Sequence, residues 1–286
     1  MLEALSYPFF RHALIAGLLA SVACGIVGTY VVVKRMASIS GSLSHAAFGG
    51  VGLGYFLGFD PILGAAGFAL ASSGAVGFAY RRRQANLDTT LAMFWSIGMA
   101  LGMLFIAMTP GYAPDLMSYL FGNILFAPPH FLWVAGALDI VIIIAVTLLF
   151  KELQAIVFDE EFAEVIGIPV APIVHILFSL IALAVVTLIR VVGVIMVIAL
   201  LTFPAAIARH WSDNIIKMMI LAVILSAFCT TVGLFGSYWL SSFSSFQVPT
   251  GPLTILMTAL LHLLSNGLRR VTRSLSSATA SKKSFP

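Results

Sequence analysis

Charge is the first thing this sequence lacks. Only 9% of the 286 residues are charged, whereas 60% are hydrophobic. A soluble domain carries about 25% charged residues, which cover the surface that faces water. The composition therefore excludes a soluble globular protein and predicts an integral membrane protein, although the length alone would suit about two soluble domains.

Cysteines and the common catalytic signatures are also scarce. The two cysteines, Cys24 and Cys229, lie inside apolar runs, so we expect buried thiols and no disulfide framework. The sequence has no G-x-x-x-x-G-K-[ST] segment, so any nucleotide hydrolysis must come from another chain. It also lacks H-E-x-x-H and G-x-S-x-G, which argues against an intramembrane enzyme.

Apolar runs long enough to cross a bilayer recur along the chain. A spanning helix needs roughly 20 mostly apolar residues, and nine segments are candidates, of which the second and the ninth are the weakest. They are Phe9–Val33, Ile39–Phe59, Ile62–Tyr80, Leu87–Thr109, Phe131–Phe150, Ile173–Val192, Val194–Ala208, Ile215–Leu240 and Leu253–Ser265. The predicted fold is an all-α polytopic bundle of eight to nine transmembrane helices.

Lysine and arginine are distributed unevenly between the two sides of this bundle. If the segment after the first span lies inside, thirteen of the fifteen basic residues lie inside, and only Arg11 and Arg190 lie outside. The positive-inside rule then puts the N-terminus outside and the C-terminus inside. This asymmetry accounts for the pI of about 9.2, so we expect no nucleic-acid partner. The basic, serine-rich tail 269–286 is expected to be cytosolic and disordered.

One inside segment, residues 151–172, is acidic where the other inside segments are basic or mixed. It holds one lysine against five carboxylates, a net charge of −4; these residues are Lys151, Glu152, Asp159, Glu160, Glu161 and Glu164. The anionic inner leaflet repels an acidic loop. We therefore do not expect this segment to lie on lipid.

The middle of this segment is typical of a short helix of about 8 residues. Asp159 is placed to cap its first turn and Gly167 to end it. Three- and four-residue spacing puts its apolar side chains on one face: Phe158, Phe162, Val165 and Ile166. A solvated connector is one interpretation, but it has no use for such a face. We therefore predict a helix that docks into a cytosolic partner.

The second predicted span carries a histidine among small residues. Read as a helix, it places five residues on one face, Ser38, Gly41, His45, Gly49 and Gly52, and a second row at four-residue steps, Gly50, Gly54 and Gly58. Small rows let helices pack closely in lipid. We expect these residues to line a pathway or to pack against neighbouring helices.

His45 is the first candidate metal ligand. An ionisable group within a span is a site hypothesis by default, and neutral imidazole is a common ligand of zinc and related divalent ions. The alternative is a histidine that is hydrogen-bonded to a serine or a carbonyl. Tetrahedral zinc needs three or four ligands, so other groups must contribute. Asp139, His175 and His262 are further candidates, although a structural role explains each of them more simply.

Four stretches, taken together, resemble a known family. They are VVVKRMASISGSLSHAAFGG (31–50), PDLMSYLFGN (114–123), FDEEFAEVIGI (158–168) and RVVGVIMVIALLTFPAAIAR (190–209). The first three resemble the second-span start, the outer-loop motif and the coupling helix of the metal-ion permeases of ATP-binding-cassette importers, the zinc, manganese and iron(II) type. The fourth resembles the most diagnostic stretch of that family. The resemblance covers residues 9–268, and four motifs in order make it specific.

The resemblance implies a homodimeric permease domain over residues 1–268, in the cytoplasmic membrane of a prokaryote. Two cytosolic ATPase subunits that use ATP would dock on it, and an extracytoplasmic metal-binding protein would deliver the cargo. The coupling residues would be Phe158, Asp159, Glu160, Glu161, Phe162, Glu164 and Gly167. No cofactor would be bound permanently, because the divalent metal ion is the transported substrate.

The second span departs from the family pattern at one position. The family usually has a carboxylate four residues before the histidine of this span, on the same helical face, and here that position is Gly41. Because imidazole is the visible ligand and the carboxylate is missing, zinc is favoured, with manganese or iron(II) as the alternatives.

Two other transport functions fit the sequence less well. An importer permease for a metal chelate or a corrinoid would need a large polar cavity, of which the sequence gives no sign. A secondary carrier driven by an ion gradient typically has paired intramembrane carboxylates and internal repeats, whereas only Asp139 lies clearly in mid-span.

Overall fold

The computed structural model of the chain describes residues 6–81, 86–110, 120–122, 124, 129–194, 197–243 and 248–283. Its regular elements are helices, and no strand occurs in this part of the chain. The prediction of an all-α protein is therefore confirmed. Most of the predicted outer-loop motif at 114–123 lies outside the described residues.

A helix is present at each of the nine predicted spans, and two short helices follow the fifth. The helices are α1 (Pro8–Val33), α2 (Ala37–Leu57), α3 (Pro61–Arg81), α4 (Leu87–Met108), α6 (Pro129–Leu148), α7 (Phe150–Phe158), α8 (Glu160–Val165), α9 (Val170–Val192), α10 (Val197–Trp211), α11 (Ile215–Phe243) and α12 (Thr250–Lys283).

Seven helices of the described part are long and apolar enough to cross a membrane. They include the ninth predicted span, within α12, but not the second or the seventh. The helix α10 has only 15 residues, and α2 has 21 but is rich in glycine and serine. A count of eight or nine spans therefore stays a prediction.

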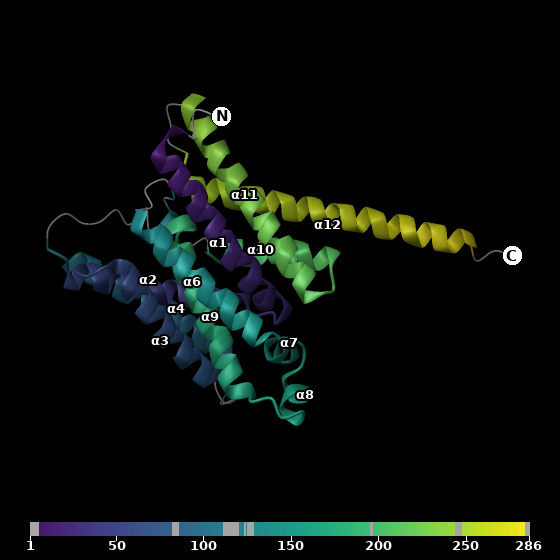
Figure 1. Cartoon of the computed structure of the whole chain (residues 1–286), viewed down its shortest axis with the longest axis horizontal. Helices are drawn as coiled ribbons and strands as arrows, with labels where there is room; N and C mark the ends of the chain where they lie inside the picture. The colour runs from purple at the N-terminus through teal and green to yellow at the C-terminus, as the bar shows by residue number, and fades with distance from the viewer. Residues whose placement is uncertain are drawn as a thin grey trace.

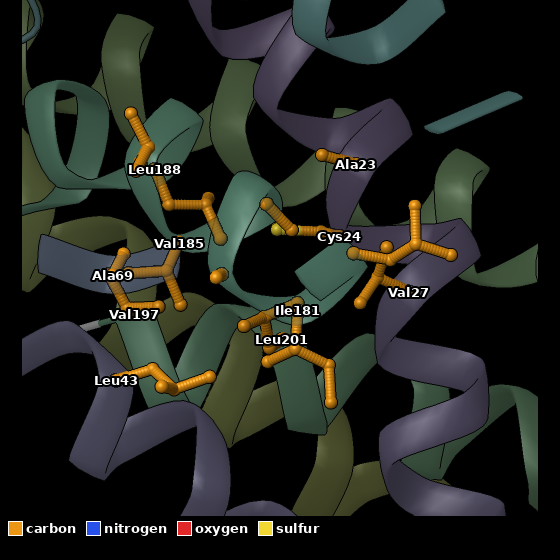
Figure 2. Close-up of a cluster of buried hydrophobic side chains, with 14 of the residues drawn as sticks. Ala23, Cys24, Val27, Leu43, Ala69, Ile181, Val185, Leu188, Val197 and Leu201 are labelled. Atoms are coloured by element: carbon orange, nitrogen blue, oxygen red, sulfur yellow. The ribbon is translucent and has the colours of Figure 1, made fainter. Parts of the chain in front are cut away.

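The helix α9 lies in the middle of the bundle, between two groups of helices. On one side α2, α3 and α4 pack together, and on the other α1, α10 and α11 do (Figure 1). Figure 2 shows the apolar contact between the groups. Side chains of five helices meet there: Ala23, Cys24 and Val27 of α1, Leu43 of α2, Ala69 of α3, Ile181, Val185 and Leu188 of α9, and Val197 and Leu201 of α10.

Glycines bring the helix backbones close together within each group. A methyl group at Gly28 of α1 would lie 2.2 Å from the carbonyl oxygen of Leu201 in α10. One at Gly25 would lie 2.4 Å from the backbone nitrogen of Val223 in α11. In lipid, where helix association relies on close packing, such contacts take the place of a hydrophobic driving force.

The last helix continues farther than the sequence suggests. The helix α12 leaves the bundle as an arm (Figure 1), and its backbone is helical as far as Lys283, where the sequence predicts a disordered tail. The physical reason is that no glycine or proline follows Gly267 before Pro286, so nothing in the local sequence ends the helix.

We expect replacement of Gly28 by alanine to destabilise the bundle, because the added methyl group forces α1 away from the α10 backbone. Overpacking of this kind costs about 1–3 kcal/mol. The measurement is the thermal midpoint of the detergent-purified protein. Gly74→Ala is the matched control, because no atom lies within 4 Å of the added methyl group. Equal midpoints for the two variants would contradict the close approach.

Candidate functional site

His45 is buried inside the bundle. It is the ninth residue of α2, with 5% of its surface exposed. Its ring stacks on that of Trp95 in α4, with 4.3 Å between the ring centroids and 18° between the planes. Its Nδ1 atom is buried and has no hydrogen-bond partner among the described residues. Because buried polar atoms are almost always paired, this nitrogen is the atom of the site that most needs a ligand.

The position one turn before His45 is crowded by two other helices. A methyl group at Gly41 would lie 2.5 Å from Cδ1 of Ile198 in α10 and 3.0 Å from Cζ3 of Trp95. A carboxylate at residue 41 would therefore require Ile198 to move. Trp95 thus contacts both His45 and the position of Gly41, and Ile198 contacts the position of Gly41. Sequence reasoning missed both, because nothing in the local pattern of their own spans marks them.

The two rows of small residues on α2 face different neighbours. In the row that includes His45, methyl groups at Gly49 and Gly52 would lie 3.1 Å and 2.5 Å from the carbonyl oxygens of Gly98 and Gly102 in α4. The first row therefore packs against α4.

The second row packs against α3. A methyl group at Gly50 would lie 2.0 Å from the carbonyl oxygen of Gly64, and one at Gly54 would lie 2.7 Å from the Cα of Pro61. Gly58 follows α2 with a φ of 75°, in the left-handed region that favours glycine. Ser38, at the other end of α2, is exposed.

Two further candidate ligands lie in separate parts of the bundle. His175 of α9 has its Nδ1 atom 2.8 Å from the carbonyl oxygen of Ala171, and its ring packs on Gly77 of α3. Asp139 of α6 is 4% exposed, and neither of its carboxyl oxygens has a described hydrogen-bond partner. It lies within electrostatic range of the Cys24 thiol in α1. Neither residue joins His45 in a shared ligand set of the described residues.

His262 of α12 packs against two other rings, and its Nδ1 atom, like that of His45, is buried without a hydrogen-bond partner among the described residues. Its ring lies 5.5 Å from that of His210 and 5.6 Å from that of Phe203, measured between centroids. Its Nε2 atom lies 3.0 Å from Nδ2 of Asn266. Across the described part of the chain, no three histidine, cysteine, aspartate or glutamate residues come together to hold a metal ion.

The acidic inside segment folds as two short helices. The backbone nitrogen of Phe162 donates to Oδ1 of Asp159 at 3.0 Å, so the predicted cap is present. The helix that it starts, α8, has six residues rather than about eight. Before it lies α7, which sequence reasoning missed although Leu153, Ile156 and Val157 form its buried face.

One apolar face, formed by α8 and the residues beside it, is not packed against any other part of the described chain. This apolar face consists of Phe158, Phe162, Val165 and Ile166, which are 62%, 57%, 84% and 54% exposed. Unpaired apolar surface of this kind at the end of a membrane bundle is typical of a protein contact.

The three glutamates of α8 have different surroundings. Glu160 forms an ion pair with Lys34 and accepts a hydrogen bond from the hydroxyl of Tyr80 at 2.7 Å. All three glutamates line a cavity of about 480 Å³ together with Tyr80, Arg81 and Val170. Glu160 is therefore held by the chain itself through Lys34 and Tyr80, which the sequence does not reveal.

The chain is similar to known membrane transport proteins. The sequence profile of the ABC 3 transport family matches residues 6–268. An uncharacterized membrane protein of Synechocystis sp. is 43% identical over 94% of both chains. The manganese transport system membrane protein MntC of Listeria monocytogenes is 29% identical over 91% of both chains. Among solved structures, PsaBC from Streptococcus pneumoniae in complex with Fab superposes with a TM-score of 0.80, at 29% identity over 91% of both chains.

We expect Gly41→Asp to destabilise the protein unless Ile198 is shortened at the same time. The new side chain meets the end of the Ile198 side chain, which must shift, so the cost should lie at the low end of the overpacking range, about 1 kcal/mol. In Gly41→Asp/Ile198→Ala the added volume has room, so the thermal midpoint should recover relative to the sum of the single changes. Strictly additive changes in midpoint would contradict the crowding at residue 41.

Proposed function

Because the chain belongs to the ABC 3 transport family, we propose that it is the membrane-spanning permease of an importer that passes a divalent metal ion into the cytoplasm. The observation that carries this proposal beyond the family is His45, a buried imidazole with an unpaired nitrogen on a tightly packed helix. Neutral imidazole is a ligand that divalent transition metals prefer. A single such ligand binds weakly, which suits a conduit from which the cargo must also leave.

The chemistry of the site favours zinc as the cargo. The imidazole of His45 stands without a carboxylate at residue 41, where Ile198 and Trp95 leave little space for one. Hard, oxygen-rich sites suit manganese better than zinc, and nitrogen ligands suit zinc. Manganese is the second candidate, because the relative from Listeria monocytogenes carries manganese transport in its name.

The metal site needs more ligands than one chain has gathered. Zinc takes three or four ligands, whereas the described residues hold no group of three. We therefore include a second copy of the chain in the proposal, which would double the number of His45 rings. His175 and Asp139 stay secondary candidates for ligands in another conformation of the pathway.

Energy must come from outside the chain, since the sequence has no phosphate-binding loop of the Walker type. The proposed complex has cytosolic ATPase subunits and an extracytoplasmic metal-binding protein, in the cytoplasmic membrane of a prokaryote. The positive-inside rule supports an N-terminus outside and a C-terminus inside. This orientation puts α8 on the cytosolic side, where its exposed apolar face would meet the ATPase.

We expect His45→Ala to lower metal uptake by about tenfold or more, because even the loss of an outer-shell partner costs about 10- to 100-fold at a metal site. The measurement is uptake of radioactive zinc by cells that lack other zinc importers, with unlabelled manganese as competitor. His130→Ala is the control, since the side chain of His130 is 61% exposed, away from the site. Normal uptake by the His45 variant, at equal protein level, would contradict the assignment.

The apolar face of α8 gives a second expectation. Phe162→Ser/Val165→Ser should reduce co-purification of the co-expressed ATPase subunit by about a hundredfold or more, since each buried apolar side chain contributes about 1.5–3 kcal/mol to a contact and every ~1.4 kcal/mol is a factor of ten in affinity. Folding should be unaffected, because both side chains are exposed. Glu164→Gln, on the same helix, separates the role of charge from that of apolar area. Undiminished co-purification with the double variant would rule out docking through this face.

A further inference from the structure

Glu160 lies where four elements of the fold meet. One of its oxygens, Oε1, pairs with the ammonium of Lys34 and accepts the hydroxyl hydrogen bond of Tyr80 at 2.7 Å. Lys34 also donates to the carbonyl oxygen of Ile156 in α7 at 3.0 Å. The carboxylate of Glu160 in α8 is thus linked, directly or through Lys34, to the end of α1, the end of α3 and the last turn of α7.

The pair of Lys34 and Glu160 joins a buried ammonium group to a partly exposed carboxylate. The side chain of Lys34 is 8% exposed and that of Glu160 is 29% exposed. A lysine near the end of a membrane helix ordinarily extends its ammonium group to water. Here it turns inward, and a charge buried to this extent is tolerated only with a partner. Each member of the pair is therefore held in place by the other.

Lys34 also begins the turn that leads into α2. The next residue, Arg35, has a φ of 59°, a left-handed conformation that residues other than glycine rarely adopt. The backbone nitrogen of Met36 donates to the carbonyl oxygen of Val31 at 2.9 Å, which closes the end of α1. A conformation of this kind persists only where its surroundings hold it. The start of α2 is therefore fixed through this turn, to which Glu160 is attached.

The helices α2 and α3 move as a pair if they move at all. Their backbones are in contact through Gly50 and Gly64, a packing too close to slide without a clash. Glu160 contacts one end of each helix of this pair. Its partner Lys34 lies just before the start of α2, and its partner Tyr80 lies in the last turn of α3. His45 lies eight residues into α2, about 12 Å along its axis.

We propose that Glu160 is a positioning residue that couples α8 to the paired helices α2 and α3, and through α2 to His45. In this arrangement the apolar face of α8 takes up the displacement of the ATPase. Glu160 passes that displacement to Lys34 and Tyr80, and the pair of helices follows. The expected effect on transport rests on the proposed function. The mechanical link between α8 and α2 does not, because it involves only residues of this chain.

The first experiment tests the link in the isolated, detergent-purified chain. Spin labels on cysteines introduced by Ser38→Cys and Val165→Cys, both at exposed positions, report the distance between the start of α2 and α8. The native Cys24 and Cys229 are buried and should not react. We expect a narrow distance distribution, which becomes broad in Glu160→Gln and in Lys34→Met. The charge-swapped Lys34→Glu/Glu160→Lys should be narrow again, and the control Glu164→Gln should stay narrow.

The second experiment uses the complete importer, reconstituted in vesicles with its ATPase subunits and its binding protein. For Glu160→Gln we expect unchanged co-purification and ATP hydrolysis, with about a tenfold fall in metal ions transported per ATP hydrolysed. The charge swap should restore most of that ratio, which a merely structural role of Glu160 does not predict. Asp213→Asn, which changes an exposed carboxylate outside the coupling residues, should keep the ratio of the unchanged protein.

The possible results separate the inference from the proposed function. A narrow distance distribution in Glu160→Gln, an unchanged ratio of ions to ATP, or a loss of ATPase binding in this variant would each overturn the positioning role. If the unchanged importer moves no metal with ATP, the proposed function fails instead. In that case the distance measurement still decides whether Glu160 links α8 to α2.

Discussion

Direct backbone contact between helices is the constraint on which the rest of this structure depends. Inside a bilayer the hydrophobic effect does not drive helices together, because no water surrounds them. They associate only where their surfaces approach closely enough for van der Waals contact. Gly25 and Gly28 allow α1 to touch α11 and α10, and Gly50 and Gly52 allow α2 to touch α3 and α4. Each group of helices therefore behaves as a rigid body, and movement must occur between the groups or at their ends.

The surroundings of His45 follow from this packing. The row of small residues that brings α2 against α4 also brings the imidazole under Trp95. Space that a side chain at residue 41 would need is taken by Ile198. The chain thus presents one nitrogen ligand in a tight, largely apolar setting. Under the proposed function, such a setting would suit brief contact with the cargo rather than a permanent metal centre.

The helices α7 and α8 lie together at one end of the bundle (Figure 1). Charged residues are scarce in the chain as a whole, so the ones that are buried carry particular weight. Lys34 and Glu160 neutralise each other inside, whereas the apolar face beside them is left without cover. One short helix is thus both an anchor to the bundle and a surface for a partner. That combination is what a passive membrane subunit needs if another chain supplies the energy.

The sequence by itself determined the membrane class, the all-α fold and the places of the described helices other than α7, because apolar length and helical spacing are local properties. It also determined the cap at Asp159 and the shared face of Phe162 and Val165. Only the tertiary structure decided that Trp95 stacks on His45, that Ile198 lies beside Gly41 and that Glu160, unlike Glu164, pairs with Lys34. These contacts join residues far apart in the chain. They depend on the rotation and depth of one helix against another, which no spacing within a single helix records.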